Sequence, residues 1–114
     1  MIICAGEALI DMIPGRTNAK EEAFVPHAGG SVYNTAIALG RLGAQVGYLG
    51  GLSKDFFGDM LVRGLNESGV ASQHSPRLDH PSTLAFVHLV DGQAEYAFYD
   101  DGTAGRMLSE DHLP

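Results

Sequence analysis

Apolar and polar residues change their spacing several times along this 114-residue chain, and each change predicts a new structural element. Residues 2–6 form a continuous apolar run, which predicts a buried strand of a parallel sheet. Residues 8–13 have an extended pattern that Pro14 and Gly15 are expected to end with a turn. A further short strand is predicted over residues 24–28.

A helix is predicted over about residues 31–42, because apolar side chains recur there at helical spacing. Ser31 is placed to cap its first turn, and Gly43 is placed to end it. A strand over residues 45–49 follows, and a second helix is predicted over about residues 56–68. Strands and helices that alternate in this way indicate an α/β fold.

The clearest local pattern is a β-hairpin in the last third of the chain. Residues 83–90 and 93–99 are rich in β-branched and aromatic residues, and Asp91-Gly92 between them favours a two-residue type I′ turn. Both faces of the first of these strands are largely apolar. Each face of the hairpin is therefore expected to need a cover.

Composition narrows the range of partners. The formal net charge of −7 argues against nucleic acid and anionic membranes as ligands. Cys4 is the only cysteine, so no disulfide forms within the chain, and it is expected to be a small buried residue. No signal peptide is evident, and no apolar stretch approaches the roughly 18 residues of a membrane span, which favours a cytoplasmic protein. No metal site is expected, because no ligand-like spacing connects the five histidines His27, His74, His80, His88 and His112.

A glycine-rich turn before the first helix is the most informative feature of the sequence. Gly29 and Gly30 let the backbone approach a ligand closely, and the helix that follows offers free N–H groups to an oxygen-rich ligand. Asn34, one turn into the helix, can both donate and accept hydrogen bonds. The turn predicts a site that binds hydroxyl groups, although two glycines alone would more often make an ordinary tight turn.

Asp11 is the second candidate. It follows the first predicted strand, and ligands gather at the carboxyl ends of the strands of a parallel sheet. A carboxylate accepts hydrogen bonds from two hydroxyl groups at once. Without further context, a solvated loop acid is the commoner interpretation of such a residue.

These features occur together in a known family. Three spaced groups run in order across nearly the whole chain: Gly6 with Asp11, Gly29-Gly30-x-x-x-Asn34, and Asp55-x-x-Gly58. In this order the chain resembles the PfkB (ribokinase-type) family of carbohydrate kinases, and most closely its fructokinase branch. Members of the family are considerably longer, so the chain is expected to be an N-terminal fragment.

The resemblance implies the N-terminal part of a ribokinase-like α/β fold. Its parallel-sheet core with helices would cover about residues 1–7 and 29–75. A small β-sheet lid over the sugar would use strands over about residues 8–15, 23–28 and 83–100. The resemblance also implies a homodimer formed through the lid sheet.

By the same resemblance, the full-length protein would be an ATP-dependent sugar kinase, most like a fructokinase that makes fructose 6-phosphate. The catalytic base, the anion hole, the nucleotide site and most of the Mg²⁺ site would lie outside this sequence. The fragment alone is therefore expected to be inactive, and no catalytic residue is assigned to it. The implied substrate-binding residues are Asp11, Gly29, Gly30, Asn34, Phe98 and Asp100.

The end of the hairpin bears on the kind of sugar. Phe98 and its aromatic neighbours Tyr96 and Tyr99 would either stack on a sugar or simply pack the hairpin. Family members that phosphorylate keto-deoxy sugar acids tend to carry an arginine after this aromatic pair. Asp100 at that position would repel a carboxylate and implies a neutral sugar, with Arg106 left open as a compensating charge. Which neutral sugar is bound stays undecided.

Two other functions fit parts of the same pattern. The same residues would suit a non-catalytic sugar-binding or dimerisation module, and a downstream reading frame would distinguish the two. A dinucleotide-binding oxidoreductase domain has the same α/β order, but no Gly-x-Gly-x-x-Gly follows the first strand. The segment 51–54 likewise lacks the Gly-Lys-Ser/Thr of a P-loop.

Overall fold

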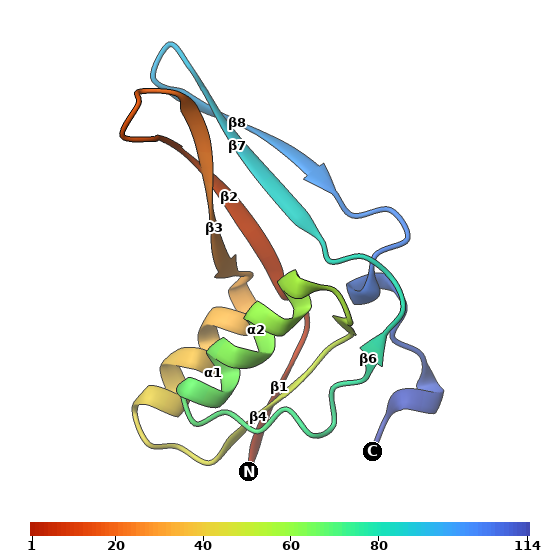
Figure 1. Ribbon diagram of the computed structural model, residues 1–114. Helices are drawn as coiled ribbons and strands as arrows, with labels where there is room; N and C mark the ends of the chain where they lie inside the picture. Colours follow the sequence, from red (N-terminus) through yellow and green to blue (C-terminus); the bar gives the residue numbers. More distant parts are fainter.

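The computed structural model describes all residues from Met1 to Pro114. Figure 1 shows helices α1 and α2 side by side next to strands β1 and β4, whereas a sheet of longer strands extends away from the helices. The molecule is accordingly elongated, with extents of 46 × 32 × 24 Å. The elements in chain order are β1 (Ile2–Ala5), β2 (Leu9–Arg16), β3 (Glu22–Gly29), α1 (Ser31–Arg41), β4 (Val46–Leu49), β5 (Leu52–Ser53), α2 (Phe56–Glu67), β6 (Arg77–Leu78), β7 (Leu84–Val90), β8 (Gln93–Tyr99) and the 3-10 turns η1 (Ala104–Arg106) and η2 (Glu110–His112).

The strands β1 and β4 form a parallel pair, with Ile2 opposite Val46 at its start. All of β4 is buried, but Ile2 and Ile3 in β1 are 51% and 46% exposed. The prediction of a buried first strand is therefore wrong for this element, although its parallel pairing is confirmed. The physical reason is that β4 is the only strand hydrogen-bonded to β1, so the other edge of β1 faces solvent.

The projecting sheet has four strands in the order β3-β2-β7-β8. The β2–β3 and β7–β8 pairs are antiparallel, and the central β2–β7 pair is parallel. Asp91 and Gly92 between β7 and β8 have φ values of 50° and 78°, as a type I′ turn requires. The predicted hairpin is thus confirmed, and it becomes half of a larger sheet.

The turn predicted at Pro14-Gly15 is wrong. Strand β2 continues through both residues to Arg16, and the chain reverses after it, where the Thr17 N–H donates to the Glu21 carbonyl. The ladder between β2 and β7 ends at Met12, so β2 has only one neighbouring strand at Pro14. A proline is tolerated where a strand lacks a neighbour on one side.

The helix ends follow local sequence signals, with one exception. Gly43 has a φ of 86° just after α1, and the Asp55 carboxylate accepts a hydrogen bond from the Gly58 N–H at the start of α2. The residue that caps the start of α1 is Gly30 rather than Ser31, so that prediction is wrong. The Ser31 hydroxyl instead donates to Glu7 Oε1, at 3.4 Å. Neither α1 nor α2 has the length and apolar character needed to cross a membrane.

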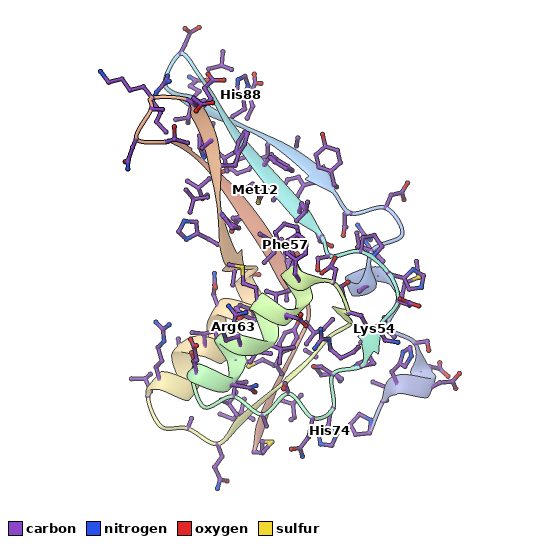
Figure 2. The ribbon with its side chains drawn as sticks, viewed as in Figure 1. Met12, Lys54, Phe57, Arg63, His74 and His88 are labelled. Atoms are coloured by element: carbon purple, nitrogen blue, oxygen red, sulfur yellow. The ribbon has the colours of Figure 1, made fainter.

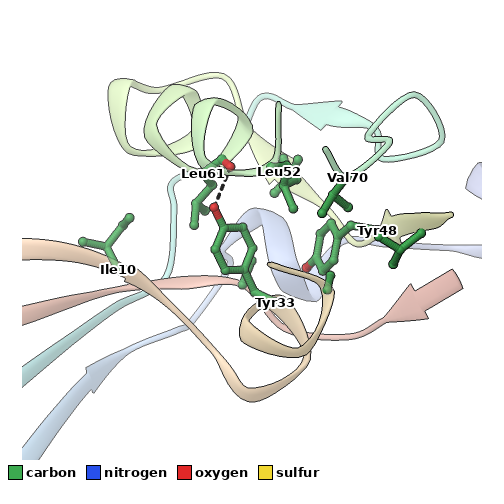
Figure 3. Packing of buried hydrophobic residues seen from close by; sticks show 10 residues of the cluster. Ile10, Tyr33, Tyr48, Leu52, Leu61 and Val70 are labelled. Carbon is green, nitrogen blue, oxygen red and sulfur yellow. Dashed lines mark hydrogen bonds between the residues drawn. The ribbon is translucent and has the colours of Figure 1, made fainter. Parts of the chain in front are cut away.

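Two buried tyrosines connect the layers of the core (Figure 3). The Tyr33 hydroxyl donates to the Leu61 carbonyl at 2.8 Å, which joins α1 to α2, and the Tyr48 hydroxyl donates to the Gly6 carbonyl. Burial raises the pKa of Tyr33 to about 12 and raises that of Tyr48 as well, so both phenols stay protonated donors at neutral pH. Cys4 packs against this core but is only partly buried. The buried cluster consists of Ala8, Ile10, Tyr33, Ala36, Val46, Tyr48, Leu52, Leu61, Leu65 and Val70.

Candidate substrate site

One face of the four-stranded sheet carries Asp11 near its base. The register places His27, Asp11, Ala85 and Phe98 in one row across the four strands, and residues paired in this way project to the same face. Ala85 is only 1% exposed and ends at a methyl group, whereas the Phe98 ring is largely exposed. Two of the sequence-predicted site residues thus share a face, with one small residue between them.

The hairpin aromatics divide between the two faces. Tyr96 and Phe98 lie stacked on the Asp11 face, with ring centroids 6.0 Å apart. Tyr99 projects to the opposite face and packs edge-on against Phe86 at 5.6 Å. That second face continues down to Met12 and Leu84, which pack with Phe57 of α2 against the buried core (Figure 2). Stacking on a ligand is therefore open to Phe98 and Tyr96, and packing accounts for Tyr99.

The glycine turn makes room for neighbouring parts of the chain. A Cβ on Gly29 would overlap Oδ2 of Asp11. A Cβ on Gly30, which has a φ of 105°, would lie 2.8 Å from the Glu7 carbonyl oxygen. The glycines were expected to let a ligand approach, and the structure adds a second reason for them. They allow β3 to enter α1 directly beside Asp11.

Asp11 and Asn34 keep their polar side-chain atoms free of other residues. Asp11 is partly buried, and its carboxylate accepts no hydrogen bond from the chain. Asn34 stands exposed on the first turn of α1, where its backbone N–H donates to the Gly30 carbonyl at 2.8 Å. Both side chains remain available to a hydroxyl-bearing ligand.

A cavity of about 620 Å³ opens beside the Asp11 face of the sheet. Gly6, which follows β1, and Gly50, which follows β4, both line it, so it lies at the carboxyl ends of the parallel pair. Ligands of α/β proteins bind at this edge. Phe98 and Asp100 line the cavity as well, whereas Asp11, Gly29, Gly30 and Asn34 do not. Glu7 connects the cavity to the glycine turn, because it lines the cavity, contacts Ser31 and lies against Gly30. We call the cavity together with Asp11, the glycine turn and Asn34 the sugar site, after the ligand that the sequence leads us to expect.

Asp100 is held at the edge of this cavity by three side chains. Thr83 and Thr103 hydroxyls lie 2.7 and 2.9 Å from Oδ1, and Arg106 Nε donates to Oδ2 at 2.6 Å. The hydrogen bond from Thr83, with those from Arg106 and Thr103, lowers the pKa of Asp100 below its usual range in spite of partial burial. The carboxylate is therefore ionised, and Arg106 balances its charge. The repulsion expected between Asp100 and an anionic ligand is correspondingly offset.

Sequence reasoning missed Glu7, Thr83 and Thr103. For Thr83 a signal was present, because a hairpin that turns at Asp91-Gly92 and pairs Leu84 with Tyr99 sets Thr83 beside Asp100. For Glu7 and Thr103 no local pattern marks a role. Their contacts depend on the path of the chain at the base of the sheet.

Asp55 ties the sheet to the helical part of the molecule. Its carboxylate accepts hydrogen bonds from the Gly58 N–H at 2.8 Å and from the Ser82 N–H and hydroxyl at 2.9 and 2.8 Å. Burial acts to raise the pKa of Asp55, but the hydrogen bonds from Ser82 and Gly58 outweigh it and lower that pKa. Because Ser82 lies just before β7, this contact orients the sheet above the site.

We expect Asp55→Ala to lower the free energy of unfolding by about 2–4 kcal/mol, since it removes a helix cap and leaves the Ser82 donors unpaired. The folded-state pKa of Asp55 lies below its unfolded value, so its stabilisation is complete above the unfolded pKa of about 4 and is lost as the pH falls. Urea unfolding at pH 7 and at acidic pH measures both effects. Asp79→Ala, at an exposed site nearby, is the control, and a loss equal to that of the control would contradict the prediction.

The fold defines a class of protein: an α/β protein whose parallel strand pair is flanked by a projecting four-stranded sheet, the arrangement expected of a ribokinase-like kinase. A family model described as "pfkB family carbohydrate kinase" matches residues 1–114, and the chain therefore belongs to that family. The chain is 52% identical over its entire length to a fructokinase of Rhizobium leguminosarum bv. trifolii, of which it covers 35%. It matches the crystal structure of fructokinase from Xylella fastidiosa with a TM-score of 0.93 and 35% identity, over 99% of this chain and 37% of that one.

A second structure of the Xylella fastidiosa fructokinase, with bound ATP, matches 99% of the chain with a TM-score of 0.92 and 36% identity, and the chain covers 37% of it. The ribokinase-like fold inferred from the sequence is thus confirmed. The chain spans about a third of the length of these relatives.

Proposed function

We propose that this chain is the sugar-binding portion of an ATP-dependent sugar kinase that converts fructose and ATP to fructose 6-phosphate and ADP. In this reaction a sugar hydroxyl loses its proton and forms a bond to the γ-phosphorus, and the bond to the β–γ bridging oxygen breaks. The observation that supports the proposal most directly is an unpartnered Asp11 carboxylate held beside the Gly29-Gly30 turn. The 52% identity to a fructokinase supports the choice of sugar.

In this proposal the chain positions the sugar. Asp11 accepts hydrogen bonds from two hydroxyl groups, Asn34 donates to a third, and Phe98 forms an apolar wall. Gly29 and Gly30 keep Asp11 and α1 close together. No group of three His, Cys, Asp or Glu side chains comes together as a metal site, so we assign no Mg²⁺ ligand to these residues. ATP is proposed to bind mainly through residues outside this sequence, and the cytoplasm, where ATP is plentiful, is the proposed location.

We expect the full-length protein to prefer fructose over 2-keto-3-deoxygluconate. Asp11 takes part in none of the salt bridges of the chain, and two carboxylates about 4 Å apart repel each other by about 1 kcal/mol even at water-like screening. Asp100 adds little to this repulsion, because Arg106 balances it. Steady-state kcat/KM for the two sugars measures the preference. A higher kcat/KM for the acid would contradict both the neutral-sugar proposal and the assignment of Asp11.

A second candidate is a non-catalytic sugar-binding or dimerisation module, because the residues assigned above would hold a ligand and none of them carries the chemical step. Kinase assays on the 114-residue chain and on the full-length protein distinguish the two. We expect the chain alone to be inactive and the full-length protein to be active. An inactive full-length protein that still binds fructose would support the module instead.

We further propose that two copies associate through the sheet face opposite Asp11. Phe24 and Tyr99 are exposed there on either side of Phe86, which contacts both edge-on. Such an exposed aromatic cluster is typical of an interface. Phe24→Glu should shift the mass measured by light scattering from dimer to monomer. Phe56→Glu, at a more exposed aromatic outside the sheet, should leave the mass unchanged.

A further inference from the structure

One basic side chain lines the cavity of the sugar site. Leu9 and Phe98 provide apolar surface, Glu7 and Asp100 are acidic, and Arg106 is the only basic residue among those that line it. None of the roles proposed above uses Arg106 as a ligand contact. Its position in the fold determines what it can do.

The backbone at Arg106 is anchored. Its N–H donates to the Thr103 carbonyl at 2.9 Å, and the Ala104 N–H donates to the Pro81 carbonyl at 2.9 Å. Thr103 and Ala104 are both buried, and a Cβ on Gly51 would overlap the Ala104 carbonyl oxygen, so η1 packs closely on the end of β4. Arg106 therefore starts from a fixed point at the cavity edge.

The side chain is oriented as well. Arg106 Nε donates to Asp100 Oδ2, and Asp100 is itself fixed through Oδ1 by Thr83 and Thr103. Each threonine hydroxyl has one proton to donate, and Oδ1 lies within reach of both. The guanidinium plane is therefore oriented by a single hydrogen bond, the one from Arg106 Nε to Asp100.

The remaining four N–H groups of Arg106 have no partner in the chain, and the side chain is 69% exposed. They form two donor pairs in one plane, which suits oxygen atoms at fixed spacing. Asp100 neutralises the positive charge, so the pair does not require an anionic ligand. Asp11 can only accept hydrogen bonds, whereas Arg106 can only donate them, and a sugar hydroxyl does both.

We propose that Arg106, oriented by Asp100, is a further substrate-contacting residue that donates hydrogen bonds to hydroxyl oxygens of the neutral sugar. The inference rests on the proposed sugar kinase function. Within it, Asp100 is a positioning residue that acts through Arg106, rather than a direct ligand of the sugar.

The test uses steady-state kinetics of the full-length protein with Arg106→Gln and Arg106→Lys. Loss of a charged donor in a closed site should lower kcat/KM for fructose by about 10- to 100-fold, mostly through KM, with little change in KM for ATP. Lysine keeps the charge but lacks the planar fork, so it should not restore activity. Arg63→Gln, at an exposed arginine of α2 (Figure 2), is the matched control and should behave as the unmodified protein.

Deoxy analogues of fructose, each lacking one hydroxyl, distinguish a direct contact between Arg106 and the sugar from a purely structural role of Arg106. For the analogue that lacks the contacted hydroxyl, Arg106→Gln should cause no further loss, whereas it should still impair the others. An equal loss for every analogue, together with a lower melting temperature, would assign Arg106 a structural role and overturn the inference. Unchanged kinetics for fructose would also overturn it, and would leave the kinase function intact. An unmodified protein that phosphorylates no sugar would instead refute the proposed function.

Discussion

Asp11→Asn should lower kcat/KM for fructose in the full-length protein by a factor that corresponds to roughly 2–4 kcal/mol of transition-state stabilisation. Asp11 is partly buried as a residue, but its carboxylate reaches solvent and receives no hydrogen bond from the chain, so its acceptor capacity is free for the sugar. Asparagine has nearly the same size but loses the charge and one acceptor oxygen.

Two measurements make this prediction specific to the site. Asp91→Asn changes an exposed aspartate at the hairpin tip, where asparagine is also favoured in the turn, and it should not alter the kinetics. The melting temperature of Asp11→Asn should stay close to that of the unmodified protein, because Asp11 forms no contact that holds the fold. An unchanged kcat/KM for fructose would remove Asp11 from the sugar site.

Gly30→Ala should lower the free energy of unfolding by about 2–4 kcal/mol and should also weaken fructose binding. Gly30 has a φ of 105°, which a residue with a Cβ adopts only under strain. The new methyl group would lie 2.8 Å from the Glu7 carbonyl oxygen, which is backbone and cannot turn away as a flexible side chain does. The start of α1 must then move away from Glu7 and Asp11, and Asn34 moves with it.

Gly43→Ala is the matched control for the backbone strain. Gly43 has a φ of 86°, but no atom lies within 4 Å of the position that its Cβ would occupy. Gly30 also has a ψ of 137°, a conformation that is largely restricted to glycine, so the difference between the two variants in urea unfolding reports the contact with Glu7 together with this extra strain. Equal losses of stability would mean that neither the contact nor the extra strain at Gly30 contributes. Unchanged fructose binding by a folded Gly30→Ala protein would mean that the turn does not position the site.

Most residues of the candidate site could be named from the sequence, because the motifs that contain them are local. The Gly29-Gly30 turn and Asn34 lie within six consecutive positions, and Asp11 lies at a fixed distance from Gly6. The sequence left the partnership of Asp100 with Arg106 open, since the five residues between them can follow many paths. What could not be predicted was that Asp100 is already occupied by Thr83, Thr103 and Arg106. That contact shifts its proposed role from repelling ligands to orienting Arg106.

The sequence by itself determined the elements whose signals are short-range. The Asp91-Gly92 turn sets the hairpin register, Asp55 begins α2, and Gly43 ends α1, because each acts on backbone groups a few residues away. Only the tertiary structure decided the parallel pairing of β2 with β7, and with it the common face of Asp11 and Phe98. It also carried β2 straight through Pro14-Gly15 and left β1 exposed, against the local patterns. The physical reason is that these outcomes depend on which distant strand lies alongside, and no spacing within one segment records that.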